Sequence, residues 1–137
     1  MSSKIFNNFS VIAGVLGGFF CQWLGGWDAL LKALVGLVIL DYFTGVLKAI
    51  YTKQLSSSVG YKGLIRKIMI FVVISTAVIV QSVLGESIPL REISIVFFIC
   101  NEGISLLENS SYFIPIPTKL KDTLIQLREE KEDSKHE

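Results

Sequence analysis

Long apolar runs without a charged side chain dominate the pattern of this chain. Ile5 to Trp27 is an uncharged run of 23 residues, and Ile68 to Gly85 is another of 18. A helix of about 18 to 20 apolar residues crosses the hydrocarbon core of a membrane, which is about 30 Å thick. The pattern therefore predicts membrane-crossing segments rather than the core of a water-soluble domain.

Four apolar stretches are predicted, at about residues 9–25, 29–47, 68–84 and 93–112. Lipid cannot satisfy free backbone groups, and the alternation typical of a β-barrel is absent, so each stretch should be an α-helix. We expect an all-α integral membrane protein with three to four transmembrane helices in a domain spanning 1–113. The glycine-rich first stretch either crosses the membrane or lies re-entrant or at its surface.

Residues 114–137 form a tail of different character. Leu120, Leu124 and Leu127 recur at helical spacing among charged side chains, which predicts a short amphipathic cytoplasmic helix. Such a helix either docks onto the inner leaflet or a neighbouring subunit, or remains a solvated tail. The highly charged residues 129–137 are expected to be disordered.

The placement of basic residues predicts the orientation in the membrane. The segment joining the second and third stretches is basic and carries no acidic residue, and in a four-helix arrangement 11 of the 13 basic residues lie on one side. By the positive-inside rule, this loop and both termini are cytoplasmic. If the first stretch does not cross, the amino terminus is outside. The basic loop residues are Lys48, Lys53, Lys62, Arg66 and Lys67.

Composition argues against several functional classes. The net charge is only +1, and the two cysteines have no partner at metal-ligand or CxxC spacing. The single histidine, His136, lies in the charged tail, and no glycine-rich phosphate loop occurs. We therefore expect no catalytic, cofactor-binding or metal site, no nucleic-acid partner and no enzymatic activity.

Two carboxylates inside the apolar stretches are the main exceptions to this apolar pattern. An ionised side chain near the bilayer centre costs about 2.5 to 3.5 kcal/mol on insertion scales, so Asp41 and Glu102 each need a partner, water or a proton. For Asp41 the candidate partners are Lys48, Arg66 or Lys67, or a residue of another subunit.

The fourth stretch carries its polar residues on one side. At 100° per residue they fall within an arc of roughly 120°, which cannot face lipid without cost. The stripe is either a hydrogen-bonded seam between helices or the lining of an aqueous path in an oligomer. Its polar residues near and beyond the midpoint are Asn101, Glu102, Ser105, Glu108 and Asn109.

Pairs of small residues four positions apart favour close helix packing. Gly14 with Gly18 and Gly45 with Ala49 are such pairs, and the second shares a helix face with Asp41. Together with the polar stripe, they predict a homo-oligomer in the lipid bilayer.

Four motifs together resemble the toxin secretion/phage lysis holin family of Gram-positive phages and clostridia. They are DYFTGVLKAI (Asp41–Ile50), SSVGYKGLIRK (Ser57–Lys67), NEGISLLEN (Asn101–Asn109) and IPIPTKLK (Ile114–Lys121). The resemblance covers about residues 41–127, with the motifs in the family's order and spacing.

The resemblance implies a small membrane protein that accumulates harmlessly, oligomerises and opens lesions at a set time. An endolysin or a secreted toxin would leave through them, without necessarily contacting this protein, and the host cell would lyse. The matching positions are Asp41, Gly45, Ala49, Gly60, Gly63, Asn101, Glu102, Glu108, Asn109, Pro115 and Pro117. Two alternatives are a small proton-coupled transporter and a membrane assembly subunit without a pore, such as a holin antagonist.

Overall fold

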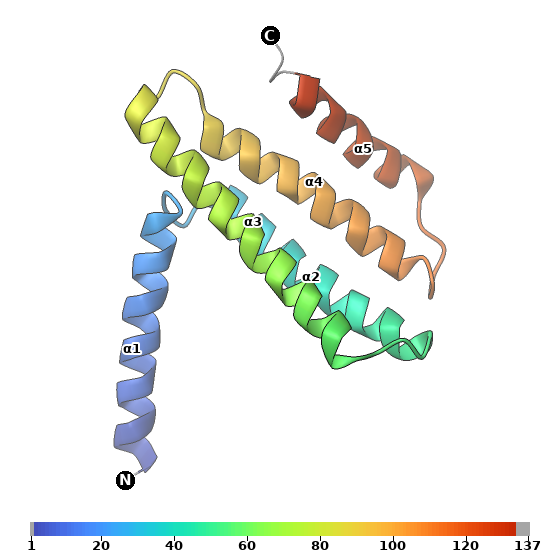
Figure 1. Ribbon diagram of the computed structural model, residues 1–137, viewed down its shortest axis with the longest axis horizontal. Helices are drawn as coiled ribbons and strands as arrows, with labels where there is room; N and C mark the ends of the chain where they lie inside the picture. Colours follow the sequence, from blue (N-terminus) through green and yellow to red (C-terminus); the bar gives the residue numbers. More distant parts are fainter. Residues whose placement is uncertain (1, 134–137) are drawn as a thin grey trace.

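The computed structural model describes residues 2–133, and all regular structure within them is helical (Figure 1). This confirms the predicted all-α class. The five helices are α1 (Ser2–Trp23), α2 (Ala29–Tyr51), α3 (Ser57–Leu84), α4 (Leu90–Ser110) and α5 (Thr118–Asp133).

Side-chain caps set the start of two of these helices. The Asp28 carboxylate accepts a hydrogen bond from the Leu31 N–H at 2.9 Å, and the Ser56 hydroxyl accepts one from the Val59 N–H at 3.2 Å. The second cap begins α3 at Ser57, where the sequence predicted a start near 68. Lys62, Arg66 and Lys67 therefore lie on a helix of about 42 Å and not in a loop.

Three helices are long and apolar enough to cross a membrane, namely α1, α2 and α3. The predicted fourth span, α4, is not among them because acidic and basic residues interrupt it. Three such helices lie within the predicted range of three to four spans.

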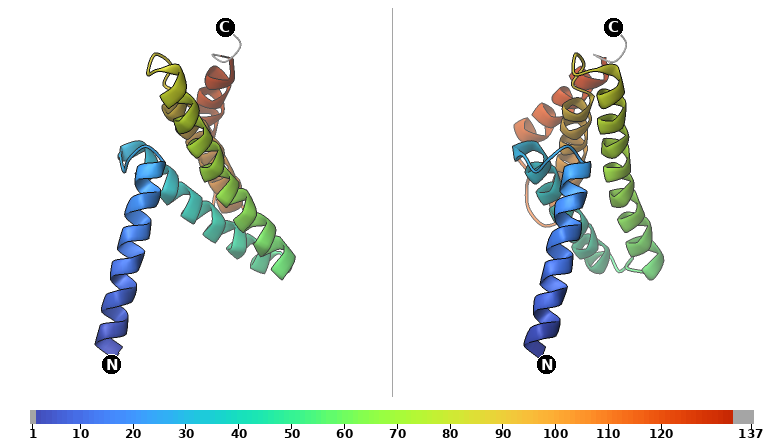
Figure 2. Two further views of the ribbon diagram at one scale, coloured as in Figure 1. Left: turned by 60° about the vertical axis from the view of Figure 1, so that its left-hand side comes forward. Right: turned by 90° about the vertical axis from the view of Figure 1, so that its left-hand side faces the viewer.

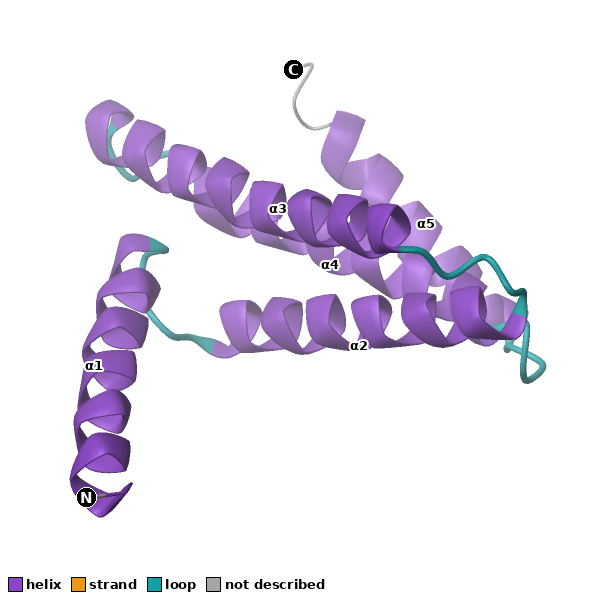
Figure 3. Cartoon of the chain, turned by 60° about the horizontal axis from the view of Figure 1, so that its bottom comes forward, coloured by secondary structure: helices purple, strands orange, loops and turns teal. Residues whose placement is uncertain are grey.

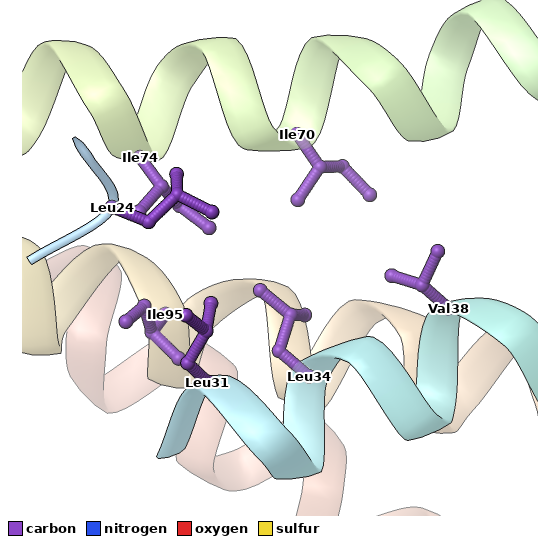
Figure 4. Close-up of a cluster of buried hydrophobic side chains, with 7 residues drawn as sticks. All are labelled: Leu24, Leu31, Leu34, Val38, Ile70, Ile74 and Ile95. Carbon is purple, nitrogen blue, oxygen red and sulfur yellow. The ribbon is translucent and has the colours of Figure 1, made fainter. Parts of the chain in front are cut away.

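The apolar core lies where α2, α3 and α4 meet (Figure 4). Figure 4 shows side chains from α2, α3, α4 and the α1–α2 connection converging on one another: Leu24, Leu31, Leu34, Val38, Ile70, Ile74 and Ile95. Because these helices share one core, α4 packs alongside α2 and α3.

Helix α1 stands apart from the other four helices (Figures 1 and 2). Its large apolar side chains are exposed along its length, from Ile5 to Trp23. It touches the bundle near its carboxyl end, where the rings of Phe20 and Phe71 lie 6.1 Å apart. An apolar helix without a protein neighbour along most of its length is suited to contact with lipid.

Helix α5 folds back along α4 (Figures 1 and 3). A Cβ added at Gly103 of α4 would lie 3.0 Å from Leu124 Cδ1, and Arg128 donates to the Asn101 side chain at 3.3 Å. Residues 129–133 belong to this helix, so the expectation of disorder was wrong for them. The rest of that stretch, 134–137, lies outside the described residues.

Candidate functional site

One ammonium group bridges two buried carboxylates between three helices. Lys67 of α3 donates hydrogen bonds to Asp41 of α2 and to Glu102 of α4. The exposed fractions of the three side chains are 11%, 6% and 7%, in that order. We call these three residues the Lys67 cluster. Asp41 thus finds its partner in Lys67, one of the candidates predicted from the sequence.

Asn109 and Gly45 complete the surroundings of Asp41. The Asn109 amide nitrogen donates to Asp41 Oδ1 at 3.0 Å. A Cβ at Gly45 would lie 3.5 Å from that nitrogen, an ordinary van der Waals contact, so this part of α2 packs directly against α4. Ala49 is buried one turn further along α2. The predicted Gly45–Ala49 pair therefore serves a helix contact within one chain.

The Lys67 cluster carries more negative than positive charge. With every group ionised, two carboxylates and one ammonium sum to −1. Burying charges is favourable only when each is paired and hydrogen-bonded, and here one negative charge has no balancing cation within the cluster. A proton, water or a displacement of the helices can each relieve this imbalance.

A cavity of about 150 Å³ opens beside the Lys67 cluster, between α2 and the first turns of α3. Asp41, Lys67 and Asn109 contribute polar groups to its lining. Tyr42 of α2 and Gly63 of α3 form part of its wall. A Cβ added at Gly63 would lie 3.4 Å from Tyr42 Cε2. Most of its lining is apolar, but Asp41, Lys67 and Asn109 can hydrogen-bond to water, and the cavity has room for several water molecules.

Two other polar residues of α4, Asn101 and Glu108, face α5. Asn101 accepts the hydrogen bond from Arg128, and Glu108 lies 3.4 Å from the Lys121 ammonium of α5. Ser105 is half-buried. The predicted single stripe is therefore divided between two sides, because α4 lies between α5 and the α2–α3 pair. In this structure four of its members, Asn101, Glu102, Glu108 and Asn109, find partners within the chain.

A second buried cation lies at the other end of the bundle. Arg91, in the first turn of α4, is 5% exposed. Its guanidinium donates to the Leu24 carbonyl at 2.6 Å, to the Gly26 carbonyl at 3.0 Å and to Asp28 Oδ2 at 2.7 Å. These contacts tie the α1–α2 connection to α4, and we call them the Arg91 clamp.

Two further features support the Arg91 clamp. Gly25 has φ +85°, which strains any other residue, and a Cβ there would lie 2.6 Å from Arg91 Cδ and displace the Arg91 side chain. The hydrogen bond from Arg91 lowers the pKa of the Asp28 carboxyl below its ordinary 3.8, and the Leu31 N–H adds to this effect. Arg91 was not predicted from the sequence. The Gly25–Gly26 pair was the one sequence feature that indicated a tight turn at this connection.

Most of the remaining predicted residues lie away from both clusters, whereas Arg66 lines the cavity beside the Lys67 cluster. Gly14 and Gly18 have no atom within 4 Å of an added Cβ. The Lys48 ammonium lies 4.4 Å from the centroid of the Tyr112 ring, and Lys53 occupies the α2–α3 connection with φ 56°. Lys62 and Arg66 are exposed on α3. Within residues 2–133, no group of three His, Cys, Asp or Glu side chains could hold a metal ion.

Comparison with known proteins gives a consistent relationship. The model of the bacteriophage holin family matches residues 18–129. An uncharacterized 14.9 kDa protein from the nagH 3′ region of Clostridium perfringens is 41% identical over 118 residues, which is 85% of this chain and 89% of that protein. No solved structure matches the chain.

Two further relatives come from a bacterium and a phage. The uncharacterized protein YqxH of Bacillus subtilis (strain 168) is 35% identical over 115 residues, 83% of this chain and 82% of the relative. A protein of Bacillus phage phi105 named "Probable holin" is 32% identical over 103 residues, 74% of this chain and 76% of the relative.

Proposed function

Because this chain belongs to the bacteriophage holin family, we propose that it oligomerises in the cytoplasmic membrane of a bacterial host and opens lesions there. An endolysin or a secreted toxin would leave through these lesions, without necessarily contacting the protein, and the cell would lyse. The chain is a multi-pass membrane protein, and the proposed activity requires no catalytic group.

The observation that carries this proposal is the Lys67 cluster. A holin has to accumulate without damage before it acts, so its intramembrane charges need partners in the resting state. Asp41, Lys67 and Glu102 partner one another within a single chain, and Asn109 adds a hydrogen bond. A chain that satisfies its own buried charges can wait in the membrane.

The same cluster supports a route to the open state. If α4 moves away from α2 and α3, Glu102 loses Lys67 and Asp41 loses the hydrogen bond from Asn109. These groups then require water, which several copies together can enclose. The cavity beside Asp41 gives water its first access. Collapse of the membrane potential can contribute, because one elementary charge crossing 100 mV is worth about 2.3 kcal/mol.

For the membrane topology, we propose that α4 crosses the bilayer together with α2 and α3, shielded by them and by α5. Its contacts with both helices along its length support this arrangement. In this arrangement the two buried charged residues of α4, Arg91 and Glu102, each have a protein partner at the depth where they lie. With α1 also crossing, the amino terminus and the end of α4 lie on the cytoplasmic side, in agreement with the distribution of basic residues.

Induced expression in a bacterial host tests the proposed function. Release of a cytoplasmic reporter enzyme of tens of kilodaltons, without other phage genes, is the expected result. Leakage of ions alone would favour a transporter, and intact membranes would favour an antagonist without a pore.

Glu102→Gln tests the part played by the Lys67 cluster. The amide keeps the shape of the side chain but removes one of the two negative charges, so membrane insertion should persist while the time of lysis shifts by a measurable interval. Glu92→Gln, on the half-exposed side chain next to Arg91, is the control on the same helix. Unchanged timing for Glu102→Gln, or equal shifts for both variants, would contradict the role of the cluster.

A further inference from the structure

Helix α5 carries apolar side chains that nothing in the structure covers. Leu120 is 49% exposed and Leu127 39% exposed, although both lie on an otherwise charged helix. They are seven residues apart, close to two helical turns, and Thr123 lies between them on the same side. Leu124 faces Gly103 of α4 instead. We call Leu120, Thr123 and Leu127 the Leu120 stripe.

The position of α5 along the bundle makes this surface unusual. The Arg128–Asn101 hydrogen bond places α5 beside the middle of α4, and α4 packs along α2 and α3, which are long and apolar enough to cross a membrane. Lys119 and Glu130 are exposed on α5 on the same side as the Leu120 stripe. Ionised groups at this level are unfavourable against acyl chains, so the outer side of α5 needs a polar neighbour.

The charge of α5 argues against a lipid surface as that neighbour. From Thr118 to Asp133 the sequence has four basic and five acidic residues, a sum of −1. Helices that lie on anionic membranes are instead rich in lysine and arginine. A surface carrying both signs around an apolar stripe is complementary to a second copy of itself.

We propose that the Leu120 stripe seats the α5 helix of a second copy of this chain. The inference rests on the proposed function, since it names the surface through which copies associate. Leu120 and Leu127 of one copy pack against those of the other, and the mixed charges beside them pair across the contact. The contact surface is thus α5, while the polar residues of α4 stay satisfied inside each copy.

Cysteine crosslinking in isolated membranes tests the proposal. In a background with Cys21→Ala and Cys100→Ala, single variants Thr123→Cys and Leu127→Cys are treated with a short bismaleimide. Glu129→Cys is the matched control, because it is also exposed but lies nine residues from Leu120, half a turn around the helix. We expect at least fivefold more crosslinked dimer from the two stripe variants than from the control.

Two results would overturn the pairing of α5 helices. One is an equal yield of dimer from all three variants, or none from any, which indicates random collision or no contact. The other is strong quenching of a fluorophore at Leu127→Cys by nitroxide-labelled lipids, which indicates that acyl chains cover the stripe.

Reporter release, measured in the same cells, separates this inference from the proposed function. Release without selective crosslinking overturns the α5 contact and leaves the holin role standing. Selective crosslinking without release supports the contact and contradicts lesion formation.

Discussion

The two buried cations of this bundle, Arg91 and Lys67, are stabilised in different ways. Arg91 donates to two backbone carbonyls and to Asp28, whose side chain is 47% exposed. Lys67 donates to two carboxylates that are 6% and 7% exposed. Carbonyl groups are neutral and stay in place, whereas paired carboxylates are charged and titratable. The Arg91 clamp therefore suits a permanent connection, and the Lys67 cluster suits a site that changes state.

An apolar core separates these two regions. Leu34, Ile74 and Ile95 are fully buried between them. Effects at sites that share no partner usually add. Substitutions in the Arg91 clamp should therefore alter stability without altering the response of the Lys67 cluster, and each variant below tests this separation.

The largest effect is expected for Lys67→Met. The change leaves Asp41 and Glu102 buried without their cation, and breaking a buried ion pair in this way costs roughly 3 to 5 kcal/mol. Folded protein in the membrane should fall sharply, as measured by detergent extraction and thermal unfolding. Arg66→Met is the matched control, because it removes the same charge from an exposed neighbouring position. Equal losses for both variants would show that only the net charge matters.

Gly25→Ala should give the next largest effect. A methyl group there would meet Arg91 Nε at 2.4 Å, and φ +85° is unfavourable for alanine. Overpacking of this kind costs about 1 to 3 kcal/mol. Gly26→Ala separates the two causes, since Gly26 has φ +103° and no atom within 4 Å of an added Cβ. Thermal unfolding that is lowered equally by both variants would leave backbone strain as the sole cause.

The sequence predicted the helices better than it predicted the site. Charge-free runs identify α1 and the apolar part of α3, a further apolar stretch identifies α2, and the spacing of leucines identifies α5. The start of α3 was wrong because Gly60, Lys62 and Gly63 are typical of a loop, while the Ser56 cap extends the helix through them. These glycines instead let Tyr42 pack against α3.

For the site, the sequence could give the need for a partner but not the geometry. Asp41 and Glu102 stand out as charges in apolar stretches, and Lys67 was one of three candidate partners within the chain. That one lysine serves both carboxylates depends on how three helices cross, which no local pattern encodes. Arg91 was not singled out because two of its partners are backbone carbonyls, which leave no trace in residue type.

A smaller effect is expected where α5 meets α4. Gly103→Ala would bring a methyl group to 3.0 Å from Leu124 Cδ1, a contact that requires a small shift of α5. We expect destabilisation of about 1 kcal/mol, seen as faster hydrogen exchange in α5 with the α2–α3 region unchanged. Adding Leu124→Ala should relieve the contact. Gly36→Ala is the control, because no atom lies within 4 Å of its added Cβ. Faster exchange throughout the bundle would contradict a local effect.

The smallest effect should appear on acidification of the Arg91 clamp. Arg91 lowers the pKa of Asp28 below 3.8, so the folded state favours the ionised carboxyl more than the unfolded state does. The resulting stabilisation is complete above the ordinary value and is lost as the pH falls through the lowered one. In detergent, the unfolding temperature should therefore drop more steeply below about pH 4 in the parent protein than in Asp28→Asn, whose amide still caps α2. Because Asp28 is half-exposed, solvent weakens this contribution, and the difference should amount to a few degrees at most. Parallel curves for the two proteins would mean that the charge on Asp28 adds nothing to the carbonyl contacts of Arg91, which would make the Arg91 clamp independent of pH and sharpen its contrast with the Lys67 cluster.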